Sequence, residues 1–149
     1  MKIKANNTLL LTVCVVALAL LCFLSVESPM RFQRQRAKRE AVVRQRIDKI
    51  KAAENKYLAR HGNYAGSFDA LVKEGFLADS LTYVPYSDNE RFTLRATIAK
   101  DGDGQEKPQV VCSAAYSQYL DGLDKTSVSN LIDKANEEGR FPGITKQIR

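Results

Sequence analysis

The first long pattern in the sequence is an uninterrupted apolar run. Residues 8–26 contain no charged side chain, and about 20 apolar residues in a helix are what a hydrocarbon core of about 30 Å requires. The sequence therefore predicts a transmembrane helix inside a membrane anchor over residues 1–28. Lys2 and Lys4 also suit the start of a signal peptide, but the run is longer than a signal-peptide core and a poor cleavage site follows it. We expect the anchor to be retained.

The second pattern is a long helix whose two halves differ. Residues 30–60 contain no Gly or Pro and are rich in good helix formers, so we expect a basic helical stem over residues 29–60. Apolar positions recur at helical spacing only in its second half. The predicted inward face consists of Val43, Ile47, Ile50 and Tyr57. Only this half is expected to pack on a folded domain, and the first half is expected to be solvated.

Residues 61–140 have the features of a small folded head domain. A turn at His61 and Gly62 is expected to end the long helix, because Gly adopts the left-handed position after a helix at little cost. A short helix then follows, with Ser67 as its predicted N-cap and Gly75 at its end.

Apolar and polar residues then alternate, which is typical of half-buried strands. The alternation predicts strands over residues 91–99 and 110–116, joined by a hairpin loop at residues 100–104. Residues 82–86 contain a proline and are expected to form an edge strand. The predicted sheet is therefore small and antiparallel.

A last helix is expected after Thr126, which offers an N-cap, and Gly139 is expected to stop it. Residues 141–149 are predicted to form a loose basic tail. Together these elements predict an α+β protein: an N-terminal transmembrane helix, a long helix stem, and a small antiparallel sheet with short helices.

Positive charge is concentrated in the stem. The formal net charge is +6, and a basic segment beside a bilayer attracts anionic head groups by about 1 kcal/mol per Lys or Arg. The candidate residues for lipid or anion contact are Arg31, Arg34, Arg36, Lys38, Arg39, Arg44 and Arg46. Nucleic acid is the alternative anion, but it is disfavoured because the aromatic residues lie away from the stem in the sequence.

Residues able to support catalysis or to bind a metal ion do not form a recognisable pattern. The only histidine, His61, has no neighbouring cysteines, and Cys112 is the only cysteine of the head, so zinc spacings, a Cys-His nucleophile and a disulfide within the head are not expected. Residues 101–106 resemble the start of a calcium loop but lack its later ligands. The sequence predicts no catalytic residue, cofactor, metal site or small-molecule substrate.

Tyrosines and glycines surround the predicted end of the long helix. They belong to one group of residues: Ala53, Glu54, Asn55, Lys56, Tyr57, His61, Gly62, Asn63, Tyr64, Ser67, Leu71, Gly75, Phe76 and Leu77. This group, between an apolar N-terminus with a long helix and a set of antiparallel strands, resembles the end of the first helix in type IV pilin-like and pseudopilin subunits. The resemblance implies a subunit of a bacterial envelope assembly whose head lies outside the inner membrane.

The apolar run departs from the pilin pattern. No Gly precedes a Phe or Met at its start, and Asn6, Asn7 and Thr8 stand where that family has an early Glu. The usual maturation and filament assembly are therefore not predicted. Separately, residues 83–94 and 120–125 resemble a group of single-pass proteins from Bacteroidota, a likeness that implies no activity.

The side of the membrane that carries the head is left open by these signals. Seven Lys and Arg follow the apolar run and only Lys2 and Lys4 precede it, so the positive-inside rule favours a cytoplasmic head. The pilin resemblance implies a periplasmic head on the inner membrane, which we take as the working assignment. The expected function is a non-enzymatic structural or interaction protein with protein partners or self-association. The alternative is a tethered basic module that binds anionic lipid or nucleic acid.

Overall fold

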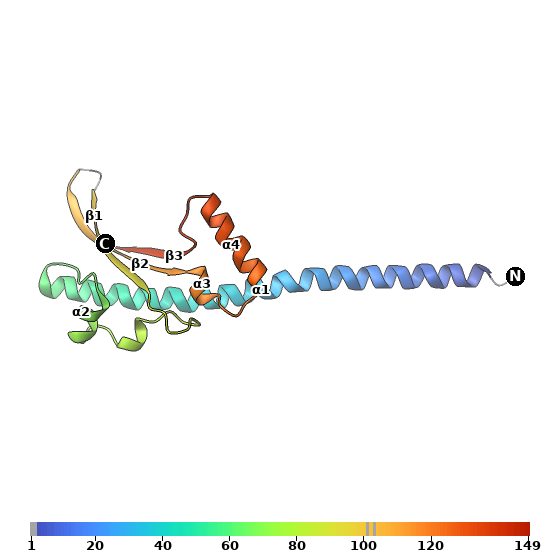
Figure 1. The fold of residues 1–149 in the computed structure, drawn as a ribbon, viewed down its shortest axis with the longest axis horizontal. Coiled ribbons are helices and arrows are strands. Elements are labelled where there is room, and N and C mark those ends of the chain that lie inside the picture. The colour runs from blue at the N-terminus through green and yellow to red at the C-terminus, as the bar shows by residue number, and fades with distance from the viewer. Residues whose placement is uncertain (1–2, 101, 103) are drawn as a thin grey trace. The chain divides into compact units, whose positions relative to one another are not determined.

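The computed structural model describes residues 3–100, 102 and 104–149. The chain divides into two compact units, residues 1–35 and residues 36–149. Helix α1 (Ile3–His61) contributes to both units (Figure 1). Pro29, the first residue of the predicted stem, lies inside α1. The predicted anchor and stem are therefore parts of one helix.

The second unit, which we call the head, contains the C-terminal part of α1 and all the remaining elements. They are α2 (Phe68–Lys73), the 3-10 helix η1 (Asp79–Leu81), β1 (Thr93–Lys100), β2 (Glu106–Ala115), α3 (Tyr116–Tyr119), α4 (Lys125–Glu137) and β3 (Gly143–Ile148). The α+β class with a long N-terminal helix, short helices and a small antiparallel sheet is confirmed.

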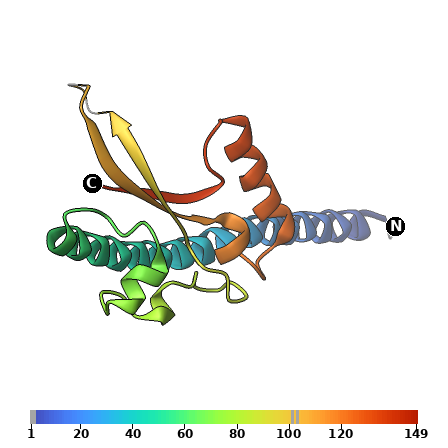
Figure 2. The same ribbon diagram turned by 60° about the vertical axis from the view of Figure 1, so that its left-hand side comes forward.

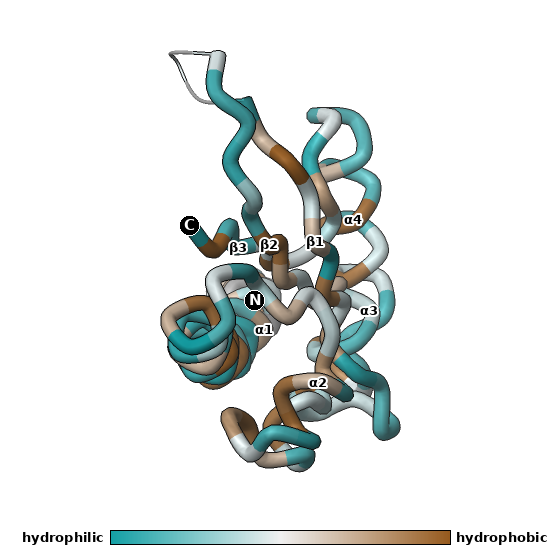
Figure 3. The backbone as a smooth tube through the Cα atoms, turned by 90° about the vertical axis from the view of Figure 1, so that its left-hand side faces the viewer, coloured by the Kyte–Doolittle hydropathy of each residue, from teal (hydrophilic) through white to brown (hydrophobic). Residues whose placement is uncertain are grey.

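The core of the head forms where the sheet meets α1. Val43, Ile47 and Ile50 of α1 are 0% exposed, which confirms the inward face read from the helical spacing. Viewed along α1, the sheet and α2 lie beside this helix within the head (Figure 3). About two turns of the stem therefore serve as the central core element of the head.

The sheet is a three-stranded antiparallel sheet with the order β1-β2-β3. In the central strand, Val110, Cys112 and Ala114 are buried, as the alternation predicted. On its far side Ala114 pairs with Ile144 and Val110 pairs with Ile148. The expectation of a loose tail at residues 141–149 is therefore wrong, because most of that segment is strand β3, with both isoleucines buried.

The free end of the β1–β2 hairpin is less buried than the sequence predicted. Leu94 is half-buried, but Ala96 is exposed and Ile98 is 67% exposed. The hairpin projects away from α1 in both ribbon views (Figure 2), so no helix covers this part of the strand. The alternation gave the right strand and overestimated the length of its buried face.

Two local predictions are wrong in detail. Residues 82–86 form no strand, because only the single bridge between Tyr83 and Arg91 is present. The N-cap of α4 is Asp124 rather than Thr126, since the Asp124 carboxylate accepts a hydrogen bond of 2.8 Å from the Ser127 backbone N–H. A cap must precede the first turn, and the helix begins one residue before Thr126.

Candidate functional site

The basic segment of α1 is the candidate site named by the sequence, and the structure divides it. Arg31 and Arg34 belong to the first unit and are exposed. In the head, Lys38 and Arg44 are exposed, whereas Arg36, Arg39 and Arg46 are half-buried. The three half-buried arginines lie against the head, and each of them has a hydrogen-bond partner there.

Arg39 joins α1 to the segment that follows α3. Its Nη1 donates hydrogen bonds to the carbonyl oxygens of Tyr119 (3.1 Å) and Asp121 (2.6 Å). The guanidinium also lies 4.7 Å from the centre of the Tyr86 ring, within the range of a cation–π interaction. Tyr86 has a positive φ of 67°, a conformation that costs a non-glycine residue energy. Arg39 therefore supports a strained loop and satisfies two backbone acceptors.

Arg46, C-terminal to Arg39 on α1, and Arg36, N-terminal to it, also form hydrogen bonds with other parts of the head. Arg46 Nη1 donates to the carbonyl oxygen of Tyr83 at 2.7 Å and to that of Ser80 at 3.4 Å. Arg36 Nε donates to Glu40 Oε1 of the same helix at 2.7 Å, and Arg36 Nη2 donates to the hydroxyl oxygen of Tyr116 in α3 at 3.5 Å. Burial would lower the pKa of Arg36, but the hydrogen bond and charge of Glu40 outweigh that effect, so the pKa is raised and the guanidinium stays charged.

Helical spacing could have revealed this division of the arginines. Around a helix of 3.6 residues per turn, Arg36, Arg39 and Arg46 lie within about 60° of Val43, whereas Arg44 lies about 100° away. The sequence predicted the same role for all seven basic residues, because the apolar stripe begins only at Val43. The other four basic residues of this segment, Arg31, Arg34, Lys38 and Arg44, are exposed.

A buried acid that the sequence did not predict as a functional residue, Glu54, lies on the same inward side of α1. Glu54 is 0% exposed, and its carboxylate accepts hydrogen bonds from the backbone N–H groups of Ala65 (2.9 Å) and Gly66 (3.1 Å). Burial raises the pKa of Glu54, and the two backbone hydrogen bonds oppose that rise. Glu54 therefore fastens the loop after α1 back onto the helix.

The loop held by Glu54 also needs a glycine. Gly66 has φ +63°, and a Cβ at this position would lie 2.9 Å from the Cβ of Ala96 in β1. A side chain would be strained by the backbone conformation and would press on the strand. The sequence signal for the buried acid was Glu54 itself, an acidic residue between Ile50 and Tyr57 on an otherwise apolar face of the helix.

Two further side chains that can react or bind a proton, those of Cys112 and His61, are held by their neighbours in the head. Cys112 is 0% exposed, and burial, aided by the charge of Glu54, raises the pKa of its thiol to about 12, so it is a poor nucleophile. The His61 ring stacks on Tyr57 with centroids 4.2 Å apart, and its Nε2 lies 2.7 Å from Glu74 Oε2. His61 thereby ties the end of α1 to the residues that follow α2.

Possible metal ligands can be compared only within the described part of the chain. Within that part, no three His, Cys, Asp or Glu side chains group so as to hold a metal ion. The residues that resembled a calcium loop include Asp101 and Asp103, which lie outside the described residues.

By length and composition, α1 contains one stretch able to span a membrane, near the N-terminus. Its large apolar side chains are exposed, from 53% at Val16 to 71% at Phe23. Such a helix is compatible with a single-pass membrane protein.

Comparisons of the chain with family models, with curated proteins and with solved structures found no match.

Proposed function

We propose that the chain is a membrane-anchored, non-enzymatic structural or interaction protein that makes protein contacts through its head. Its setting is an envelope assembly of the pseudopilin kind, with the head on the periplasmic side of the inner membrane. The observation that carries the proposal is that α1 (Ile3–His61) supplies both the apolar stretch and the central core element of the head.

The contacts of α1 within the head support this proposal. The helix contributes Val43, Ile47 and Ile50 to the core, and it also supplies Arg39 and Arg46, which bind backbone carbonyls of two separate loops. The helix that holds the head together is also the helix that contains the apolar stretch, which supports a protein whose folded head is tethered to a membrane.

Crosslinking in native membranes tests the proposal. Treating membranes that contain the full chain with an amine-reactive crosslinker is expected to give an adduct of discrete mass, with either a second copy or a protein partner. The matched control is Ile47→Asp, which removes the fold of the head and leaves the apolar stretch intact. Monomer alone, or the same adduct from the control, would reject the proposal.

A topology measurement tests the periplasmic assignment separately. Asn130 is exposed on α4, so Asn130→Cys, in a chain with Cys14 and Cys22 replaced by alanine, supplies one accessible thiol. Cys112 stays silent because it is buried and its pKa is raised to about 12. Labelling by a membrane-impermeant maleimide in intact bacterial cells is the expected result. Labelling only after permeabilisation would place the head in the cytoplasm.

A second candidate function, a tethered module that binds anionic lipid or nucleic acid, rests on the exposed cations Lys38 and Arg44. For the full chain in zwitterionic nanodiscs, this function predicts oligonucleotide or anionic-vesicle binding that weakens steeply with salt. The double variant Lys38→Gln, Arg44→Gln would bind more weakly. Binding that does not depend on salt or on these residues would exclude it.

A further inference from the structure

Strand β1 (Thr93–Lys100) forms one edge of the sheet, because the strand order is β1-β2-β3. Its eight residues pair with β2 in one unbroken antiparallel register. Among the described residues, no backbone hydrogen bond joins the other side of β1 to another segment. An uncovered edge with unpaired N–H and C=O groups is a template for a further strand.

The hydrogen bond at the end of β2 shows which backbone groups of β1 point outward. The Tyr116 N–H donates to the Pro142 carbonyl oxygen at 2.9 Å, and these residues are opposite each other when the β2–β3 register is continued by one pair. Because hydrogen-bonded and non-hydrogen-bonded pairs alternate in an antiparallel ladder, the even-numbered residues of β2 face β3 and the odd-numbered ones face β1. The partners of those odd-numbered residues in β1 are also odd-numbered. The N–H and C=O groups of Leu94, Ala96 and Ile98 therefore point away from β2, and we call them the free edge.

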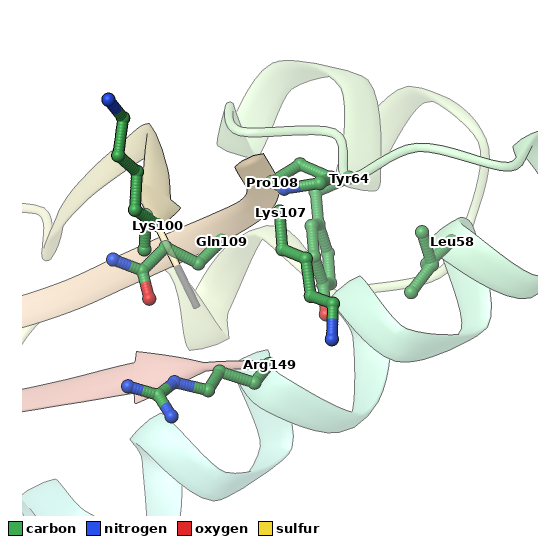
Figure 4. A pocket seen from close by; sticks show the side chains of 8 residues that line it. Leu58, Tyr64, Lys100, Lys107, Pro108, Gln109 and Arg149 are labelled. Carbon is green, nitrogen blue, oxygen red and sulfur yellow. The ribbon is translucent and has the colours of Figure 1, made fainter. Parts of the chain in front are cut away.

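The proline of β2 agrees with this assignment. Pro108 lies opposite Ile98 in the register and is even-numbered, so its missing N–H does not weaken the ladder with β1. Pro108, Gln109 and Arg149, which follows β3, border a cavity of about 290 Å³ (Figure 4). The open side of β2 thus lacks a donor, whereas β1 contains neither a proline nor a bulge. Of the two sides of the hairpin, β1 is the better template.

The side chains of β1 indicate what kind of strand fits beside it. Ala96 and Ile98 are exposed, Ile98 at 67%, and their spacing of two residues puts them on one face. The charged residues of β1 are Arg95 and Lys100, both exposed and both basic. An added strand gains from apolar side chains opposite Ala96 and Ile98. It also gains from acidic side chains opposite Arg95 and Lys100.

We propose that the free edge binds an extended peptide segment of a partner protein, with apolar residues alternating with polar and acidic ones, as a further antiparallel strand. Main-chain hydrogen bonds supply affinity in this mode of binding, and the side chains supply selectivity. A second copy of β1 would bring the cations Arg95 and Lys100 again and no acid, so the charges favour a different protein. The free edge specifies a contact for the interaction function proposed above and rests on that function.

Titration of the full chain in phosphatidylcholine nanodiscs tests the free edge. The probe, from its N-terminus, is fluorescein-Gly-Gly followed by the seven-residue segment Glu-Thr-Val-Thr-Val-Glu-Val, and binding is followed by fluorescence anisotropy after subtraction of empty nanodiscs. In the antiparallel register the first residue of this segment lies opposite Lys100 and the sixth opposite Arg95. We expect saturable binding, and a probe with Lys in place of both Glu should bind at least about tenfold more weakly.

Methylation of the peptide nitrogens distinguishes strand addition from other binding. The third and fifth residues of the segment lie opposite Ile98 and Ala96, and their N–H groups point at β1. Methylating both nitrogens should weaken binding at least about tenfold, because two hydrogen bonds are lost. The N–H groups of the second and fourth residues point away from β1. Methylating those two is the matched control and should leave the affinity within about twofold.

A variant of the chain tests the same edge from the other side. Ile98→Pro removes an outward N–H and leaves the ladder with β2 intact, so it should weaken the probe at least about tenfold. Ile98→Val keeps the donor and a branched side chain and is the matched control. Unchanged urea unfolding of Ile98→Pro verifies that lost binding is not lost folding, and the methylated probes give the same test without any substitution.

Four results would overturn the free edge as a peptide site. They are equal binding by the two methylated probes, equal binding by the Lys and Glu probes, no saturation up to about 1 mM probe, and a dimer of the chain that Ile98→Pro dissolves, which would assign the edge to a second copy. The crosslinking experiment separates this site from the assembly function. A crosslinked adduct without probe binding rejects only the free edge, and probe binding without an adduct rejects only the assembly.

Discussion

Two apolar stretches of α1 have opposite exposure in the structure. Around residues 9–24 the large side chains are exposed, with Val16 at 53% and Phe23 at 71%. Further along, Val43, Ile47 and Ile50 are 0% exposed. The first stretch is apolar on all sides, and the second is apolar on one side only. A one-sided stripe can be covered by a sheet, whereas an all-round apolar surface needs a surrounding apolar medium.

This difference predicts that membrane retention and the stability of the head can be lost independently of each other. Substitutions in the first should change membrane retention and leave the stability of the head unchanged. Substitutions in the second should change the stability of the head and leave membrane retention unchanged. The measurements below separate the two stretches, beginning with the largest expected effect.

The largest effect is expected from two charges in the all-round apolar stretch. An arginine at the centre of a spanning helix costs about 3 kcal/mol, so Val15→Arg together with Leu18→Arg should cost about 6 kcal/mol of insertion free energy. Sedimentation after alkaline extraction should show the chain leaving the membrane fraction. Val15→Leu with Leu18→Val keeps the surface apolar and is the control. Full retention of the double arginine variant would contradict a spanning helix.

The next effect is expected at the inward stripe. Ile47→Ala should lower the free energy of unfolding of the head by about 2–5 kcal/mol, because it removes buried methyl groups and leaves a cavity. Urea unfolding in detergent can be followed by tyrosine fluorescence, since the chain has six Tyr and no Trp. Leu18→Ala is the matched control, and a similar loss of head stability in that variant would break the distinction between the stretches.

Glu54 is a buried polar residue on the inward face of α1, which is otherwise apolar. Glu54→Ala removes the acceptor of the Ala65 and Gly66 N–H groups and should lower the free energy of unfolding by about 2 kcal/mol. Glu54→Gln keeps one acceptor and should cost less. If the alanine variant unfolds as the wild type does, the loop does not depend on this carboxylate.

The same residue predicts a pH dependence. Burial raises the pKa of Glu54 in the folded head, so the folded state holds its proton more tightly than the unfolded state. The contribution of Glu54 to stability is fully present below the ordinary glutamate pKa and is lost as the pH rises through the raised value. Urea unfolding across this interval should show a decline in the wild type that is absent in Glu54→Gln.

Local patterns predicted the parts of the fold that depend on near neighbours in the sequence. The stripe of Val43, Ile47 and Ile50, the helix end at Gly62 and the alternation in β2 all follow from periods of 3.6 or 2 residues or from turn chemistry. The structure has each of them, and Gly62 has the positive φ, 77°, that the turn requires.

Strand β3 could not be predicted in the same way because its pairing is distant. Ile144, Lys146 and Ile148 point to one face of the strand, and the lysine interrupts the apolar alternation. Lys146 is accommodated there by an ion pair with Asp48 of α1. The interruption makes sense only when a residue about a hundred positions earlier is beside it, which no local window contains.

The candidate site was predicted as a charge cluster; helical spacing could have separated its inward arginines from the outward ones, but it could not name their partners. Nothing in the local sequence of Arg46 shows that its partners are the carbonyls of Ser80 and Tyr83. Composition therefore identified the basic segment, while the role of each arginine followed from which side of the helix the head covers.

The smallest predicted effect tests that division residue by residue. Arg46→Gln should lower the free energy of unfolding by about 1 kcal/mol, because the half-buried guanidinium donates to two carbonyls and partial exposure reduces the strength of such bonds. Arg44→Gln changes an exposed arginine two positions earlier and should leave urea unfolding within about 0.5 kcal/mol of the wild type. Equal losses in both variants would mean that the arginines stabilise the head through their summed charge. A loss confined to Arg46→Gln would assign that arginine to the fold and leave Arg44 available to an external anion.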